Sequence, residues 1–220
     1  MSSNCTAPLN KATIVDIEFL YESKKKKFPK ELCIYHLDSN QIQNVIISSP
    51  MSSITNPAAI VQNRYVTQHF HFIDHSAGFT SQETAIDLLK SACHGREVYV
   101  KGSEKARVLS NILAQTVFDL DKIGCPKVSD LYNISATGCI HPMHTGEFLH
   151  CSQVKCIKFG TWLYKHLYHM WNQTGESKNY FRQMHIQSAV IPRKTTTAAT
   201  AFATHSGKHM SKTESLIKNE

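Results

Sequence analysis

The segment between Cys125 and Cys151, which reads CPKVSDLYNISATGCIHPMHTGEFLHC, concentrates side chains that can bind a metal ion. Thiolates and imidazoles suit Zn²⁺, which takes four ligands in a tetrahedron. The spacing is not that of a regular pair of CxxC motifs, so several ligand sets stay open. The available donors are Cys139, His144 and Cys151 as the best suited, His141 and His150 as alternative nitrogens, and Cys125 or Glu104 to complete the set. The competing interpretation is a group of reduced cysteines and surface histidines.

A second candidate site is the pair of acids in the apolar run ATIVDIEFL, residues 12–20. Asp16 and Glu18 are two positions apart, and residues with this spacing project to the same side of a β-strand. Two carboxylates on one side of a strand can hold a divalent metal ion that activates water for phosphodiester hydrolysis. The alternative is a pair of acids near a strand end with no chemical role.

The stretch HFHFIDH forms a third group, in which His69, His71 and His75 lie close in sequence to Asp74. These side chains could bind a second metal ion or act as an acid and a base. The stretch QNRYVTQHFHFIDH is ambiguous between helix and strand, and a strand with alternating exposed histidines is the simpler interpretation of this group.

The apolar pattern predicts the elements that must position these residues. Strands are expected at residues 12–20, at about 32–38 and 43–48, and at 96–102 and 116–123. Helices are expected at 80–93, with Thr80 and Glu83 as a capping box, and at 103–114 and 152–171. Three leading strands followed by β–α–β crossovers are the order of an RNase H-like α/β fold, a mixed sheet with flanking helices.

Charge and composition divide the chain of 220 residues into three parts. Residues 1–12 are expected to form a flexible arm, 13–173 the RNase H-like domain with its zinc-binding loop, and 174–220 a basic, disordered tail. The tail holds about +4 of the formal net charge of +7, which favours an acidic partner such as nucleic acid. The basic residues expected to contact phosphates are Lys24, Lys25, Lys26, Lys27, Arg193, Lys194, Lys208 and Lys212. For the lysine run at 24–27, a solvated turn at a hairpin tip is the alternative.

With IVDIE on its first strand, the predicted order of elements resembles the DnaQ-like exonucleases of the RNase H superfamily. In that family four acids and usually a histidine hold two divalent metal ions, which would assign catalytic or vestigial roles to Asp16, Glu18 and His150. The chain departs from the family at two positions. Lys105 in VKGSEKARVL and Lys155 in HCSQVK stand where the family has metal-binding aspartates. Lysine would repel the ions, so Mg²⁺- or Mn²⁺-dependent exonuclease activity is expected to be absent or very weak.

The Cys/His segment also resembles the Maelstrom domain of the animal piRNA pathway, a DnaQ-like fold with a degraded acidic site. A Glu-Cys-His-Cys set holds zinc in that family. The resemblance assigns this role to Glu104, Cys139, His144 and Cys151, whereas Asp16 and Glu18 depart from the family.

The stretch YVKGSEKARVL…VFDLDKIGCP…C…HC is similar to proteins of arthropod genomes and arthropod DNA viruses, such as the third non-structural protein of insect densoviruses. The similarity spans about residues 13–170. It implies a role in viral DNA replication or in dealing with host nucleic acid, with replication or small-RNA pathway proteins as partners.

Three functions therefore compete: a zinc-stabilised protein that binds single-stranded nucleic acid, a nuclease with a non-standard site, and a pure protein-interaction module. The nuclease would use Asp16, Glu18, Glu104 and His150. A polar N-terminus predicts no signal peptide, and no apolar run approaches the roughly 20 residues that span a bilayer. We expect an intracellular protein, in the nucleus or cytoplasm, or in the host nucleus if the chain is viral.

Overall fold

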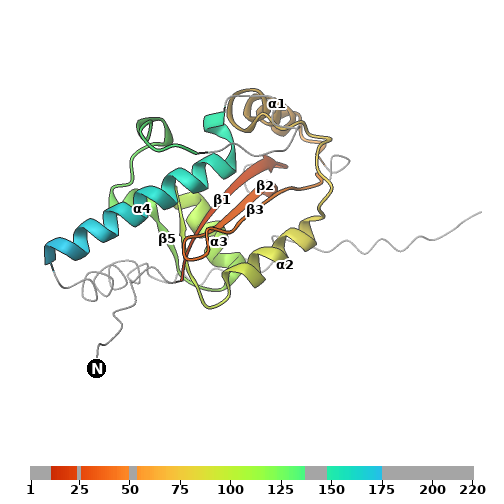
Figure 1. Ribbon diagram of the computed structural model, residues 1–220. Coiled ribbons are helices and arrows are strands. Elements are labelled where there is room, and N and C mark those ends of the chain that lie inside the picture. Colours follow the sequence, from red (N-terminus) through yellow and green to blue (C-terminus); the bar gives the residue numbers. More distant parts are fainter. Residues whose placement is uncertain (1–10, 24–25, 50–53, 137–147, 175–220) are drawn as a thin grey trace, which may run out of the picture.

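The computed structural model describes residues 11–23, 26–49, 54–136 and 148–174, which form a five-stranded mixed sheet with flanking helices (Figure 1). The strands are β1 (Ala12–Tyr21), β2 (Lys27–His36), β3 (Ile42–Ile46), β4 (Glu97–Val100) and β5 (Val117–Asp119). Their order across the sheet is β3-β2-β1-β4-β5. Strand β2 is antiparallel to both β1 and β3, and β4 and β5 run parallel to β1. This α/β arrangement is compatible with the predicted RNase H-like fold.

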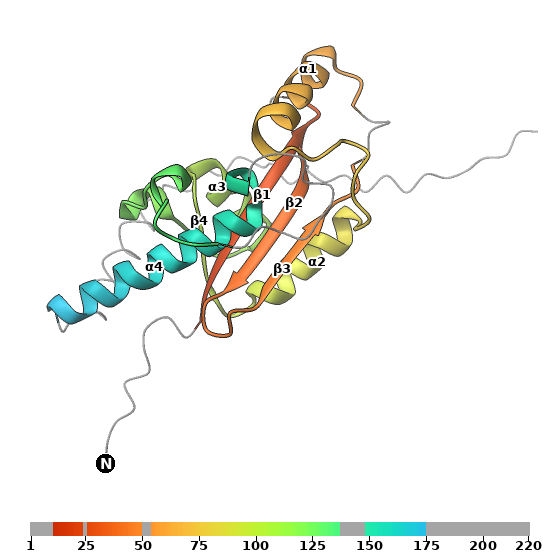
Figure 2. The same ribbon diagram turned by 45° about the horizontal axis from the view of Figure 1, so that its top comes forward.

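The helices cover both faces of the sheet. They are α1 (Pro57–Val66), the π-helix η2 (Thr67–His71), α2 (Gln82–Cys93), α3 (Ser103–Leu113), η3 (Leu120–Ile123), η4 (Val128–Asp130), η5 (Phe148–His150) and α4 (Ser152–Thr174). Helices α2 and α3 pack on one face, and α4 packs on the other (Figure 2). None of the helices in the described part of the chain combines the length and apolar character that a bilayer crossing needs.

The central strand β1 is apolar on both sides because both faces of the sheet are covered. Ile14 belongs to the core beneath α4, together with Phe159 and Leu163, whereas Val15 and Ile17 belong to the core beneath α2 and α3. Helix α4 approaches β2 closely at Gly160, where an added Cβ would lie 2.7 Å from the side chains of Tyr35 and Leu37. The two cores hold β1, and with it the acid pair, in a fixed position.

The predicted strand through the histidines of residues 69–75 is wrong. Helix α1 is capped by Asn56, whose side chain accepts from Ala58 N–H, and it begins at Pro57, a position that suits proline. The helix continues into η2 until Phe72 adopts a left-handed conformation with φ 55°. The helical geometry leaves His69 exposed and buries His71, so the three histidines do not alternate along one face.

Three predicted boundaries are also corrected. Helix α2 is capped by Ser81, whose Oγ accepts from Thr84 N–H at 3.0 Å, rather than by Thr80. The fifth strand ends at Asp119, because the Asp119 side chain caps the short helix η3. This helix occupies residues 120–123, which were predicted to continue the strand. Strand β2 begins at Lys27, earlier than predicted, so Lys27 is a strand residue rather than part of an exposed hairpin tip.

Candidate functional site

Asp16 and Glu18 project from β1 toward the face that α4 covers, as their spacing predicts. Asp16 is 2% exposed and lies opposite Cys33 of β2, and Glu18 is opposite Glu31. The register of the β1–β2 pair shifts between Glu18 and Phe19, as at a β-bulge. Such irregularities are common next to functional sites because they re-aim side chains.

Two lysines bind these acids directly. Lys105 Nζ donates to Asp16 Oδ1 at 2.7 Å and to Glu18 Oε1 at 3.1 Å. Lys155 Nζ donates to Glu18 Oε1 at 2.5 Å and lies 3.7 Å from Asp16 Oδ2. We refer to Asp16, Glu18, Lys105 and Lys155 as the lysine–carboxylate network. Its two positive and two negative charges balance.

The network is assembled by the first turns of α3 and α4. Before α3, Gly102 adopts φ 105°, a conformation that favours glycine, and its N–H donates to Asp119 Oδ1 at 2.9 Å. Asp119 is buried at the end of β5 and so ties the start of α3 to the sheet. In α4, the N–H of Lys155 donates to Cys151 O at 3.0 Å. Both lysines therefore stand on fixed helix ends rather than on loops.

The electrostatics of the network favour the charged forms of Glu18, Lys105 and Lys155. Burial alone would raise the pKa of Glu18, but Lys105 and Lys155 outweigh burial and hold that pKa well below its usual range. Burial alone would lower the pKa of each lysine, yet Asp16 and Glu18 raise both above the ordinary value. All three groups are therefore charged at neutral pH.

This arrangement does not fit a two-metal site. A divalent ion on β1 would need the oxygens of Asp16 and Glu18, and both carboxylates already accept from ammonium groups. Two lysine charges beside the same oxygens would repel a cation strongly in a buried position. No hydrolytic step through bound Mg²⁺ or Mn²⁺ is derived for this site.

The zinc set lies partly outside the described residues, which exclude Cys139, His141 and His144. Glu104 is in the first turn of α3 with its side chain 56% exposed, and its carboxylate pairs with Lys27. Cys151 is buried just before α4 and is not part of a disulfide. Across the described ranges, no group of three or more His, Cys, Asp or Glu residues is placed to hold a metal ion.

Cys125, an alternative zinc ligand, lies in the core beneath α4. Burial raises the pKa of its thiol to about 12, which favours the protonated form, whereas zinc binds the thiolate. The surroundings of Cys125 therefore favour a core residue.

His71 interacts electrostatically with Glu18, and His150 packs against the ring of Phe72, next to His71 in the sequence. The ring of His150 packs edge-on against Phe72 with ring centroids 5.1 Å apart, and no described hydrogen bond joins it to Asp16 or Glu18. His71 is 1% exposed, and its Nδ1 accepts from Ile73 N–H at 3.1 Å. Burial lowers the pKa of His71 to about 4, although Glu18 and Glu31 act in the opposite direction. Periodicity alone did not indicate that His71 would be buried.

The predicted phosphate contacts are mostly outside the described residues: Lys24, Lys25, Arg193, Lys194, Lys208 and Lys212. Lys26 pairs with Glu22 at 2.8 Å, and its side chain is 43% exposed. Lys27 is only 14% exposed, pairs with Glu104 and lies over the ring of Tyr21 at 4.7 Å. Lys26 stays available to a phosphate, whereas Lys27 has a structural role in this arrangement.

No protein-family model matches the chain, and a search of curated proteins found no match.

Proposed function

We propose that this chain binds nucleic acid, single strands in particular, through an RNase H-like domain that lacks two-metal catalysis. The lysine–carboxylate network is the observation that carries the proposal. The acid pair keeps its place on the central strand, and Lys105 and Lys155 bind the carboxylate oxygens that catalytic metal ions would need. A domain of this kind can retain a nucleic-acid surface after the chemistry is lost, because binding and metal catalysis use different groups.

The charge distribution supports nucleic acid as the partner. Residues 175–220 hold seven Lys or Arg against three Asp or Glu, and the whole chain carries +7. A basic segment next to a folded domain adds sequence-independent affinity for phosphates. A role in viral DNA replication or in handling host nucleic acid, with replication or small-RNA pathway proteins as partners, is the finer proposal, and it rests on the similarity to densovirus proteins.

The direct test combines binding and cleavage assays on labelled single-stranded DNA and RNA. We expect salt-dependent binding to at least one of them and no digestion with Mg²⁺, Mn²⁺ or EDTA. Digestion that Asp16→Asn abolishes would establish an active nuclease instead. If the folded protein binds neither strand, the interaction module becomes the better function.

A reversal experiment tests the network itself. The Lys105→Asp/Lys155→Asp variant would place four carboxylates where two lysines and two acids now meet, and we expect it to gain Mn²⁺ binding measured by calorimetry. Lys165→Asp is the control, because it changes the charge on an exposed part of α4. Mn²⁺ binding by the wild-type chain that Asp16→Asn abolishes would contradict the proposal.

We further propose one zinc ion per chain, held by Glu104, Cys139, His144 and Cys151. Glu104, whose side chain is 56% exposed, would exchange its ion pair with Lys27 for the zinc ion. Structural zinc contributes directly to folding, so Cys139→Ser or Cys151→Ser should give insoluble or loosely packed protein. Elemental analysis of the purified chain checks the stoichiometry, and a well-folded protein without metal would rule the zinc out.

A further inference from the structure

Helix α1 is attached to the domain along one narrow line. Its buried residues are Ala59 and Asn63, one turn apart. Asn63 binds the end of β1 with its side-chain amide: Oδ1 accepts from Tyr21 N–H at 2.6 Å, and Nδ2 donates to Tyr21 O at 2.7 Å. Ala59 packs with Phe28 and Ile54. The rest of the helix is left facing away from the sheet.

The outward side of α1 and η2 is apolar and aromatic, although it is exposed. Four large apolar side chains are 45–68% exposed: Ile60, Val61, Tyr65 and Phe70. Together with Arg64 and His69, which are also exposed, they form what we call the α1–η2 face. An exposed apolar group of this kind marks an interaction surface more often than isolated exposed residues do.

The rings on the α1–η2 face are held together. Tyr65 lies 4.6 Å from the His69 ring and 5.7 Å from the Phe70 ring, measured between centroids. The π-helical turn brings neighbours four and five positions away onto the same side as Tyr65. Phe72 closes the turn with a positive φ, which is costly for an aromatic residue. π-Helical turns and strained residues both concentrate at functional sites.

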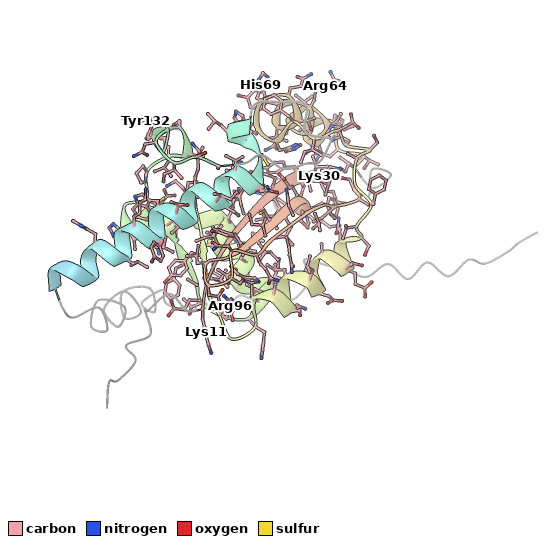
Figure 3. The ribbon with its side chains drawn as sticks, in the orientation of Figure 1. Lys11, Lys30, Arg64, His69, Arg96 and Tyr132 are labelled. Carbon is pink, nitrogen blue, oxygen red and sulfur yellow. The ribbon has the colours of Figure 1, made fainter. Side chains whose placement is uncertain are left out.

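The charge of residues 54–73 favours an anionic partner. Residues 54–73 contain Arg64 and two histidines and no Asp or Glu. Figure 3 shows Arg64 and His69 at the same end of the molecule, over α1. Exposed aromatic rings next to a guanidinium group suit single-stranded nucleic acid. Any base can stack on an aromatic ring, and any phosphate attracts a cation.

We propose that the α1–η2 face is a stacking platform for the bases of single-stranded nucleic acid, with Tyr65 and Phe70 as the stacking rings and Arg64 as the phosphate contact. This inference rests on the proposed nucleic-acid function and assigns it to a surface. It is independent of the lysine–carboxylate network, whose charges are balanced and partly buried.

The test uses the full chain, oligo(dT) and oligo(rU), and a chain of abasic phosphates of the same length. Affinities are measured at about 0.3 M salt, where the electrostatic contribution is reduced. Tyr65→Ala and Phe70→Ala should each weaken binding to the oligonucleotides by at least about fivefold and leave binding to the abasic chain unchanged. Tyr65→Phe should restore binding, since it keeps the ring.

Tyr132→Ala is the matched control, because Tyr132 is 87% exposed and belongs to a different part of the surface. Both target side chains are about half exposed, so their loss should leave the circular dichroism spectrum unchanged. If the wild-type chain binds and the two variants bind equally well, the platform is wrong while the proposed function stands. An equal loss on the abasic chain would also overturn stacking. If the wild-type chain binds no strand, both proposals fail together.

Discussion

Two ammonium groups and two carboxylates contact one another in this domain. Replacing any member of the lysine–carboxylate network therefore leaves another charge without its partner. The side chains of Lys105 and Lys155 are 22% and 14% exposed, and that of Asp16 is 3% exposed. Removing one partner of a buried pair leaves an uncompensated charge, which costs more than the pair itself contributes. Substitution of single residues therefore tests the network most directly.

Lys155→Met should lower the free energy of unfolding by about 3 kcal/mol, because Glu18 loses its shortest hydrogen bond within a buried network. Urea denaturation at neutral pH measures the loss. In the Glu18→Gln/Lys155→Met double variant the loss should be smaller than the sum of the two single losses, since neither charge is then left alone. The control is Lys165→Met on the exposed side of α4. A loss no larger than that of the control would show that the network contributes no stability.

His71 should make stability fall in mild acid. Its pKa is lowered to about 4 in the folded chain, against about 6.5 when unfolded, so the unfolded state binds more protons between these values. The stability is present above about pH 6.5 and is lost as the pH falls toward 4, by up to about 3 kcal/mol. His71→Gln should remove this part of the slope in urea denaturation at several pH values. His36, His75 and His166, whose pKa values burial also lowers, remain in both proteins. An unchanged slope would mean that His71 accepts a proton without unfolding.

At the scale of elements, Asn63 provides the polar attachment of α1 to the sheet within the part of the chain that the structure describes. Asn63→Ala would remove both hydrogen bonds to Tyr21 and should cost about 2 kcal/mol. Hydrogen exchange of the α1 amides should speed up more than exchange in β1 or α4. Gln62→Ala, at an exposed neighbouring position, is the control. Equal protection of α1 in the variant and wild type would place its attachment in the apolar contacts of Ala59 instead.

The elements with a clear period could be predicted from sequence, whereas α1 and η2 could not. The continuous apolar run of β1 and the helical spacing of α3 and α4 carry local signals that tertiary contacts do not reverse. Residues 57–71 mix apolar, aromatic and polar side chains without a clear period, and contacts with Tyr21 and Phe28 decide their structure. Strand alternation likewise predicts that Asp16 and Glu18 lie on the same side of β1. The burial of His71 depends on a π-helical turn, which no hydrophobic period in the sequence indicates.

At the scale of the whole molecule, the charge is unevenly divided between the domain and residues 175–220. The described residues contain 15 Lys or Arg and 13 Asp or Glu, and several of these charges are paired with one another. Most of the net charge of +7 therefore belongs to other residues, chiefly 175–220. A nearly balanced domain favours a binding mode in which the domain provides contacts to bases and the basic segment provides affinity for phosphates.

Removal of residues 175–220 should therefore change the salt dependence of binding more than its base dependence. Each phosphate neutralised on a single strand contributes about −0.7 to the slope of log K against log salt. If the segment makes about three to five such contacts, the truncated chain should show a slope flatter by about 2 to 4 and weaker binding at low salt. The loss from Tyr65→Ala should persist in the truncated chain, since the α1–η2 face lies on the domain. A full-length variant with the seven Lys and Arg of this segment changed to Gln separates charge from length. An unchanged slope after truncation would place the phosphate contacts on the domain, with Arg64 and Lys26 as the first residues to substitute.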